Sequence, residues 1–340
     1  MSEVIVANGL YGQAGQRIRH ALGGQAVAVV TDENVARHHL KGLVAQLEQA
    51  GYRVTSRVLQ PGEGSKSLDT YAGLLGFLHE SGITRTDCVV ALGGGVVGDV
   101  AAFAAATWLR GVKLAQVPTS LLAQVDSSVG GKAAIDLPQG KNLVGAFYPA
   151  GLTLVDPMLL RTLPGEQYCD GLAEVIKYGV IQDAALFDMI PYDESEEEDI
   201  VRRCVGIKQQ VVARDLYDRG ERQLLNFGHT MGHALERLSG YTLPHGQAVA
   251  IGMALMARAS HRMGCCTADT MGRVVNLIHL MGLPTATDQK PEVIHSALLG
   301  DKKRAGDTLT LVTLHAVGDC RLTPVSVDQA ARWVRAGCAA

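Results

Sequence analysis

The feature that most constrains the fold is a regular alternation of short apolar runs with helical patterns through the first half of the chain. The runs are rich in β-branched residues and are typical of buried strands: residues 27–31, 54–59, 88–92 and 113–117. Helical spacing follows the first and second runs, and Asn34 and Ser67 are expected to cap these helices. This alternation predicts an α/β, Rossmann-like parallel sheet with helices on both faces.

The pattern becomes mainly helical after about residue 156. Apolar residues recur at helical spacing in five segments: residues 167–180, 197–215, 229–238, 246–263 and 267–280. A short β pair is expected at 308–314 and 320–323. Because a domain averages about 150 residues, we expect two domains, an α/β domain over 1–160 and a mainly α-helical domain over 161–340.

Composition excludes several classes of protein. Lys and Arg number 31 against 34 Asp and Glu, a balance that argues against a nucleic-acid-binding protein. No apolar run approaches the roughly 20 residues of a membrane span, and the N-terminus lacks the pattern of a signal peptide. The seven cysteines include no C-x-x-C pair. We therefore expect a reduced, cytoplasmic protein in which most cysteines are small buried hydrophobes.

A glycine-rich segment directly follows the third predicted strand. Residues 93–98 contain G-x-G-x-x-G and are followed by Asp99 at the start of a helix, a pattern that favours binding of a phosphate group. The motif lacks the acidic residue about 20 positions later that a standard Rossmann site would have. Asp32 or Glu63 could supply the ribose contact instead. The alternative is a glycine-rich turn that packs a helix against a strand.

A group of histidines and one glutamate indicates a metal site. His229 and His233 stand four residues apart on one helical face, and His245 follows at a Pro-His-Gly turn. The preceding helical segment carries Glu174 and Lys177 on one face. A carboxylate and two histidines with an open position suit a catalytic zinc-type site. Spacing alone leaves open which two histidines are ligands, and core or capping histidines are the alternative.

Basic residues in glycine-rich or apolar surroundings form a third candidate cluster. Lysines in such surroundings suit the oxygens of a phosphate group, because each offers a mobile point charge. The alternative is a set of solvated surface lysines. The cluster consists of Lys132, Lys141, Lys177, Lys208, Arg222, Lys302 and Lys303.

Taken in chain order, these motifs resemble the 3-dehydroquinate synthase family. The resemblance extends from about Asp32 to Lys303, most of the chain, and is closer to this family than to other sugar-phosphate cyclases. The motifs that carry it are residues 93–99, 110–111, 116–120, 126–132, 140–142, 173–177, 225–233, 245–246 and 301–303.

The resemblance implies an NAD-binding N-terminal domain, a helical metal-binding C-terminal domain and an active site in the cleft. The implied enzyme is a phosphate lyase of the shikimate pathway that makes 3-dehydroquinate from 3-deoxy-D-arabino-heptulosonate 7-phosphate. Its reaction combines transient oxidation by NAD, β-elimination of phosphate, re-reduction and aldol closure. The implied cofactors are NAD and a divalent metal, zinc or cobalt, and the implied assembly is a homodimer.

The resemblance also implies roles for individual residues. The metal ligands would be Glu174, His229 and His245, with His233 beside the metal on the proton path. The substrate residues would be Asp126, Lys132, Asn142, Lys177, Lys208, Arg222, Asn226 and Lys302, with Arg110 reaching the site of the partner subunit. The NAD residues would be Asp32, Asn34, Glu63, Lys66, Gly94, Gly95, Asp99, Thr119, Ser120, Lys141 and Thr162.

The chain departs from the family pattern at one position, and three alternative functions remain open. Asp218 stands where the family often has Glu, so the carboxylate is one methylene shorter. A different sugar-phosphate cyclase would share most of these motifs. A metal-dependent polyol dehydrogenase would accumulate NADH and would not need the phosphate-binding lysines, and a catalytically idle NAD-binding scaffold would not need the metal set.

Overall fold

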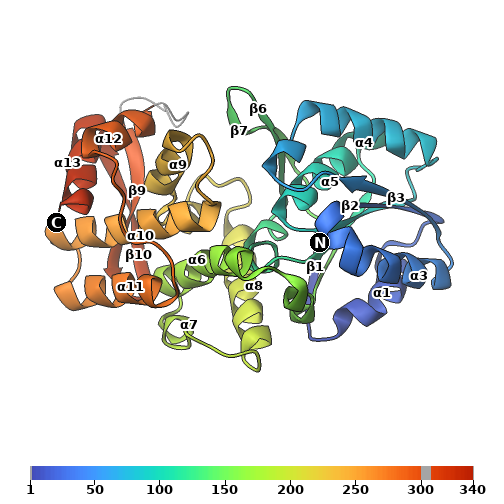
Figure 1. Cartoon of the computed structure of the whole chain (residues 1–340), viewed down its shortest axis with the longest axis horizontal. Coiled ribbons are helices and arrows are strands. Elements are labelled where there is room, and N and C mark those ends of the chain that lie inside the picture. Colours follow the sequence, from blue (N-terminus) through green and yellow to red (C-terminus); the bar gives the residue numbers. More distant parts are fainter. Residues whose placement is uncertain (1, 300–307, 340) are drawn as a thin grey trace. The chain divides into compact units, whose positions relative to one another are not determined.

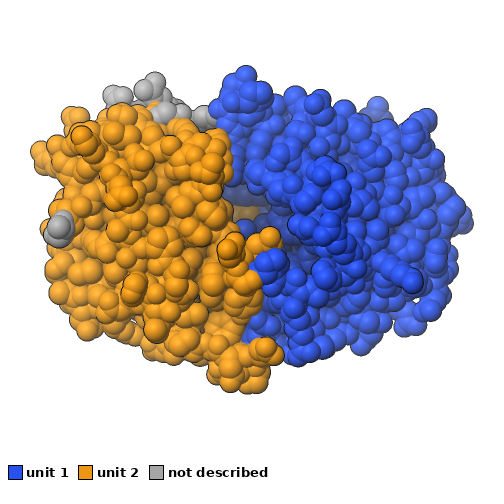
Figure 2. Space-filling view, in the orientation of Figure 1, with its two compact units in different colours: residues 1–164, 197–209 blue, residues 165–196, 210–340 orange. Residues whose placement is uncertain are grey.

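The chain forms two compact units in the computed structural model, which describes residues 2–299 and 308–339. Figure 1 labels the helices and strands, and Figure 2 colours the two units. Unit 1 comprises residues 1–164 and 197–209, and unit 2 comprises residues 165–196 and 210–340. The chain therefore passes between the units three times, and the last passage falls inside helix α8 (Glu197–Arg214).

Unit 1 is built on a six-stranded parallel sheet with the strand order β1-β8-β5-β4-β2-β3. The four strands expected from apolar runs are confirmed within one residue at each end, and they lie side by side as β5-β4-β2-β3. The sheet strands are β1 (Glu3–Val6), β2 (Ala26–Asp32), β3 (Arg53–Leu59), β4 (Cys88–Gly93), β5 (Lys113–Pro118) and β8 (Leu152–Val155).

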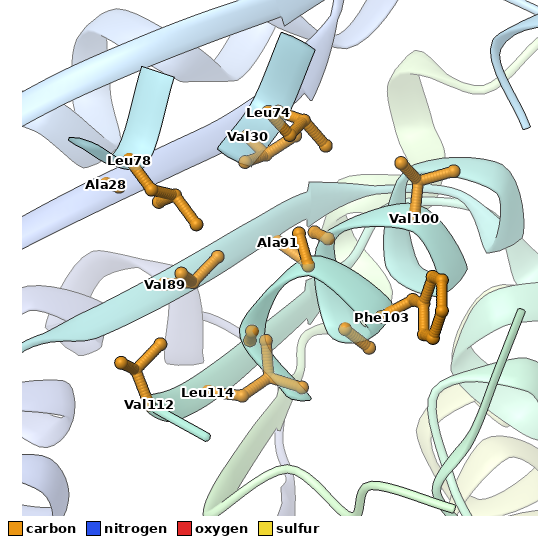
Figure 3. Packing of buried hydrophobic residues seen from close by; sticks show 14 of the residues in the cluster. Ala28, Val30, Leu74, Leu78, Val89, Ala91, Val100, Phe103, Val112 and Leu114 are labelled. Atoms are coloured by element: carbon orange, nitrogen blue, oxygen red, sulfur yellow. The ribbon is translucent and has the colours of Figure 1, made fainter. Parts of the chain in front are cut away.

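Helices cover both faces of this sheet, as the alternation predicts. Successive residues of a strand point to opposite faces, so Ala28 and Val30 join one apolar core while Val27 and Val29 join the other. Figure 3 shows the first core, where Leu74, Leu78, Val100 and Phe103 pack on the sheet. The unit 1 helices are α1 (Ala14–Leu22), α2 (Glu33–Val35), α3 (Lys41–Gln49), α4 (Leu68–Glu80) and α5 (Gly95–Thr107).

Unit 1 differs from the sequence-based expectation in a helix cap and in several strands that were not predicted, β1 and β8 among them. Asp32, not Asn34, caps the helical segment after β2, because its carboxylate accepts the N–H groups of Asn34 and Val35 at 2.8 and 3.0 Å. Ser67 caps α4 as expected. An antiparallel hairpin of β6 (Lys132–Leu137) and β7 (Gly140–Phe147) occupies a stretch for which no strands were predicted.

Unit 2 is mainly helical, as predicted, and α10 lies at its centre. Most residues of α10 are buried, and it packs on α6, α9, α11 and α13. A two-stranded antiparallel sheet, β9 (Thr308–Ala316) and β10 (Asp319–Ser326), confirms the expected β pair. The helices are α6 (Gly165–Ile181), α7 (Ala184–Asp188), α9 (His229–Leu238), α10 (His245–Arg262), α11 (Ala268–Leu280), α12 (Pro291–Leu299) and α13 (Val327–Cys338).

All seven cysteines are free thiols in the structure. Cys88, Cys204 and Cys320 are buried, whereas the other four are half-buried, so the expectation that most are buried is wrong. Burial raises the pKa of the Cys88 thiol to about 12. None of the helices within residues 2–299 and 308–339 has both the length and the apolar character needed to cross a membrane.

Asp87 ties the loop before β4 to the start of β2. Its carboxylate accepts the N–H groups of Gln25, Ala26 and Thr84, each at 2.9 Å, and the hydroxyl of Thr84 at 2.6 Å. Burial alone would raise the pKa of Asp87, but these hydrogen bonds outweigh it and lower the pKa from 3.8 to about 2. A depression of this size corresponds to about 2.5 kcal/mol of folding stability at neutral pH.

We therefore expect Asp87→Asn to lower the free energy of unfolding by about 2–3 kcal/mol at pH 7. Because the folded pKa is depressed, this contribution is present above about pH 4 and disappears as the pH falls towards 2. Calorimetric melting of both proteins across this range measures it, with Asp288→Asn on an exposed residue as the control. A difference between wild type and Asp87→Asn that stays constant down to pH 2 would contradict this assignment.

Candidate active site

The carboxyl ends of three neighbouring strands form the first part of the candidate site. Asp32 ends β2, the glycine loop follows β4, and Thr119 follows β5. The backbone N–H of Thr119 donates to Gly93 O at 3.1 Å. In parallel sheets, ligands bind beyond these ends. The structure therefore brings Asp32, Gly94, Gly95, Thr119 and Ser120 to one edge of the sheet.

The glycine loop leaves room that a larger residue would fill. A Cβ on Gly94 would lie 3.2 Å from Ser120 Oγ, and a Cβ on Gly95 would lie 3.1 Å from Ser127 Oγ. Helix α5 begins at Gly95, and no side chain caps its N-terminus. Its first backbone N–H groups and the helix dipole therefore suit a phosphate group. These observations fit the pyrophosphate of a dinucleotide.

A buried ammonium organises the neighbouring polar cluster in unit 1. Lys66 Nζ lies 2.7 Å from the Asp99 carboxylate and 3.9 Å from Glu63, and it donates to Asn142 Oδ1. Lys141 Nζ lies 3.6 Å from Glu63. Burial would lower the pKa of Lys66, but Asp99 and Glu63 outweigh it and raise this pKa. Asn142, which the resemblance places on the substrate, thus contacts Lys66, which the resemblance places on NAD.

Lys208 and Asp126 form a second charged pair in unit 1. Lys208 is buried and its ammonium contacts both the carboxylate of Asp126 and its backbone oxygen, the latter at 2.6 Å. Lys132 is exposed at the start of β6. The fold itself favours glycine at the preceding position, because φ of Gly131 is +69° and a Cβ there would lie 2.8 Å from Pro149 N.

Three further predicted residues of unit 1 lie at exposed positions. Arg110 lies in a turn where φ is +68°, next to Leu109 with φ +50°. Asn34 is exposed at the start of α2. Thr162 is exposed, and its hydroxyl lies 2.7 Å from Nε2 of His39. Of these three, Asn34 contacts the sheet edge of the site through its backbone N–H, which donates to Asp32 Oδ1 at 2.8 Å.

Glu174, His229 and His245 converge inside unit 2. Their candidate ligand atoms all lie within 4.8 Å of one another. Glu174 Oε1 is 3.3 Å from His229 Nε2 and 3.4 Å from His245 Nε2. These separations exceed ordinary hydrogen bonds, but they are close to the roughly 3.3–3.4 Å between ligand atoms of a tetrahedral ion with bonds of about 2.0–2.1 Å. The arrangement therefore fits a divalent metal.

Three helices of unit 2 supply these residues. Glu174 and Lys177 lie one turn apart on α6, His229 opens α9, and His245 opens α10. The α6 pair is almost completely buried, and the Lys177 ammonium contacts Glu174 Oε2, the oxygen that does not face the histidines. Oε1, the oxygen that faces the two histidines, has no partner in ordinary hydrogen-bond geometry. A buried carboxylate in this state gains stability when it binds a cation.

The electrostatics of this cluster also favour a cation. Burial would raise the pKa of Glu174, but Lys177 and His229 outweigh it and hold the pKa well below its usual range. Burial lowers the pKa of His229, which keeps its imidazole neutral. Burial would also lower the pKa of His245, yet its contacts with Glu174 and Glu236 raise it to about 10. Positive charge is therefore stabilised between the two carboxylates.

His233 lies beside this cluster rather than within it. Its ring centroid is 5.3 Å from that of His229 and 6.1 Å from that of His245. Its Nε2 is 3.9 Å from Oε2 of Glu236, and its side chain is 40% exposed. This side chain is positioned to exchange protons at the edge of the cluster.

Two carboxylates near His245 were not predicted from the sequence. Glu236 is buried on α9, and its Oε1 lies 3.5 Å from His245 Nδ1. Asp170 on α6 accepts the N–H of Gln247 at 3.1 Å and so holds the start of α10. Glu236 stands three residues after His233 and seven after His229, so helical periodicity offered a signal for it.

The remaining predicted residues that the structure describes lie before α9. Arg222 and Asn226 belong to a short helical turn, Glu221–Asn226, where buried Arg222 donates to Leu216 O at 2.7 Å. Asp218 lies in the preceding loop with φ +58°. Lys302 and Lys303 lie outside the described residues.

The fold and site together define a class of enzyme that combines a dinucleotide with a divalent metal. Unit 1 has the sheet edge and glycine loop that suit a dinucleotide, and unit 2 has the carboxylate–imidazole cluster that suits a metal. Comparisons with known proteins define the family within this class.

Family models match in two adjoining parts. Residues 56–170 match the model described as 3-dehydroquinate synthase N-terminal, and residues 171–304 match 3-dehydroquinate synthase C-terminal. A 3-dehydroquinate synthase of Clostridium acetobutylicum is 41% identical, with 98% of this chain and 96% of the relative covered. The chain belongs to the 3-dehydroquinate synthase family.

Two solved structures share the fold over nearly the whole chain. One is the 2-epi-5-epi-valiolone synthase of Streptomyces hygroscopicus with NAD⁺ and Zn²⁺ bound, at 27% identity and a TM-score of 0.89 over 99% of this chain and 95% of that one. The other is a 2-deoxy-scyllo-inosose synthase complexed with carbaglucose-6-phosphate, NAD⁺ and Co²⁺. It has 26% identity and a TM-score of 0.86 over 98% of this chain and 96% of that one.

Proposed function

We propose that this chain converts 3-deoxy-D-arabino-heptulosonate 7-phosphate to 3-dehydroquinate and orthophosphate as a step of the shikimate pathway. It uses NAD and a divalent metal, zinc or cobalt. The observation that carries the proposal is the convergence of Glu174, His229 and His245 in a chain of this family. Related cyclases with NAD⁺ and Zn²⁺ or Co²⁺ bound support the choice of cofactors.

The two cofactors supply chemistry that side chains lack. When bound, NAD would supply a reversible hydride acceptor and the metal a Lewis acid that lowers the pKa of a substrate hydroxyl. Glu174 Oε1 and the Nε2 atoms of His229 and His245 would hold the metal. The glycine loop, Asp32 and Thr119 would hold the dinucleotide, together with Asn34, Glu63, Lys66, Gly94, Gly95, Asp99, Ser120, Lys141 and Thr162.

The chain's own residues hold the substrate and move its protons. Oxidation of the C5 hydroxyl acidifies the adjacent C–H bond, and phosphate then leaves by β-elimination. His233, at the edge of the metal cluster, would accept the proton of the C5 hydroxyl. The cationic side chains and amides would hold the carboxylate and phosphate oxygens: Lys132, Asn142, Lys177, Lys208, Arg222, Asn226 and Lys302. Asp126 would orient Lys208 through the pair they form.

Three wider assignments belong to the same proposal. Residues 1–160 would form the NAD-binding domain, and residues 161–340 the metal- and substrate-binding domain. The protein would act as a homodimer, with Arg110 reaching the phosphate site of the partner subunit. The free thiols support a reducing, cytoplasmic location.

Release of orthophosphate from the heptulosonate phosphate tests the proposal. The purified protein should release phosphate with NAD and metal present, stop after dialysis against a chelator, and recover when Zn²⁺ or Co²⁺ is added. Phosphate release that continues without either cofactor would overturn the mechanism. Release from a different sugar phosphate, but not from this one, would favour another cyclase.

A further inference from the structure

The buried Glu236 is the group of the metal cluster to which neither the sequence nor the reaction assigns a part. We propose that Glu236 is a positioning residue that accepts a hydrogen bond from the Nδ1–H of His245 and so directs its Nε2 lone pair towards the metal. This inference rests on the metal site proposed above. It adds a residue that touches neither the metal nor the substrate.

The two nitrogens of His245 face two different carboxylates. Nε2 lies 3.4 Å from Glu174 Oε1, whereas Nδ1 lies 3.5 Å from Glu236 Oε1. An imidazole that binds a metal is neutral and carries one N–H and one lone pair. If Glu236 holds the N–H at Nδ1, the lone pair must lie on Nε2, which faces the cluster. The separation of 3.5 Å exceeds an ordinary hydrogen bond, as do the separations in the metal cluster, and such contacts tighten when a site is occupied.

His229 provides an independent example of the same arrangement within the site. Its Nδ1 lies 3.2 Å from Phe227 O, and a carbonyl oxygen can only accept a hydrogen bond. The Nε2 lone pair of His229 therefore also faces Glu174. Glu236 accepts the Nδ1–H of His245 in the same way that the backbone carbonyl of Phe227 accepts the Nδ1–H of His229. Outer groups that fix a ligand's tautomer and orientation typically strengthen metal binding about 10–100-fold.

The position of Glu236 makes it suited to hold His245. It is 3% exposed and lies on α9, the helix that also presents His229. His245 is the first residue of α10, where its backbone lacks the support of a preceding helical turn. A side-chain contact from the neighbouring helix compensates for that freedom. A rigid ligand loses less conformational entropy when the metal binds.

The same residues also allow a competing interpretation. His233, Glu236 and His245 have candidate ligand atoms within 4.8 Å of one another and could form a second metal site. In that case His245 Nδ1 would bind an ion and could not carry a proton. The two interpretations predict different metal stoichiometries, one ion per chain for a positioning role and two for a second site.

Metal affinity measured on matched variants tests the proposal. The dissociation constant for Zn²⁺, from competition with a chelator, should rise about 10–100-fold in Glu236→Ala and less in Glu236→Gln, whose amide oxygen can still accept. Glu292→Gln, on an exposed glutamate of α12, is the control and should bind as wild type does. Wild type should bind one ion per chain. Far-ultraviolet circular dichroism verifies that each variant is folded.

Proton NMR of the Co²⁺-loaded protein reports the tautomer directly. Wild type should show two exchangeable, paramagnetically shifted Nδ1–H signals, one for His229 and one for His245. Glu236→Ala should lose the second through fast exchange with water and keep the first. Unchanged affinity together with two retained signals would overturn the positioning role, and so would two ions per chain. Failure of wild type to bind any metal would instead overturn the proposed metal site itself.

Discussion

Replacing His245 with alanine is expected to empty the metal site and to lower kcat/KM by about a thousandfold or more. The Lewis acid contributes several kcal/mol to catalysis, and His245 Nε2 is one of three atoms that converge on its position. His233→Ala is expected to keep the metal and to lower kcat about 100-fold or more, the usual effect of losing a proton-transfer group. Its ring lies beside the cluster, with Nε2 near Glu236.

Metal content by mass spectrometry and steady-state rates of both variants decide this assignment. The reverse pattern, an empty site in His233→Ala and a full one in His245→Ala, would show that the ligands are wrongly assigned. Retained metal in both variants would leave only Glu174 and His229 as essential ligands and would also contradict the prediction.

Gly252→Ala is expected to destabilise unit 2 by about 3 kcal/mol or more. Gly252 lies in the middle of α10, where a Cβ would overlap the carbonyl oxygen of Gly228 and come within 2.9 Å of Gly232 N. These are backbone atoms of α9 and its cap, so no side chain can move to make room. The helices would have to separate, and overpacking of this kind is costly. Because α9 carries His229, metal affinity should fall as well.

A second helical glycine provides the matched control. A Cβ on Gly272 in α11 would meet no atom within 4 Å, so Gly272→Ala should instead raise stability by about 0.5–1 kcal/mol. Calorimetric melting of the two variants and wild type, with Zn²⁺ affinity measured alongside, tests the comparison. Equal melting temperatures for Gly252→Ala and wild type would contradict the close contact between α9 and α10.

Strands β2, β4 and β5 were predictable because they are buried on both faces, whereas the shorter β1 and β8 were not predicted. Strand β2, for example, reads as an unbroken apolar run, since Val27 and Val29 enter one core and Ala28 and Val30 the other. The β6–β7 hairpin gave no such signal. Its residues alternate weakly and include Lys132, Gly140 and Lys141, which resemble a glycine-rich connection. Only pairing across the hairpin defines these strands.

The candidate site was partly predictable for a similar reason. Helical spacing alone places His229 and His233 on one face of α9 and pairs Glu174 with Lys177 on α6. It could not choose between His233 and His245, because the meeting of His245 with Glu174 depends on how α6, α9 and α10 pack. Glu236 was missed although it lies on the same face of α9, since a helical glutamate is ordinarily a solvated residue.

This chain is expected to use NAD without net oxidation of its substrate. One reaction mixture tests it most directly, with orthophosphate and the absorbance of NADH at about 340 nm followed together over many turnovers. NAD is regenerated in each cycle, so phosphate and 3-dehydroquinate should accumulate in equal amounts while the absorbance stays flat. Growth of the NADH signal in step with substrate consumption, without phosphate release, would contradict the claim and identify a dehydrogenase.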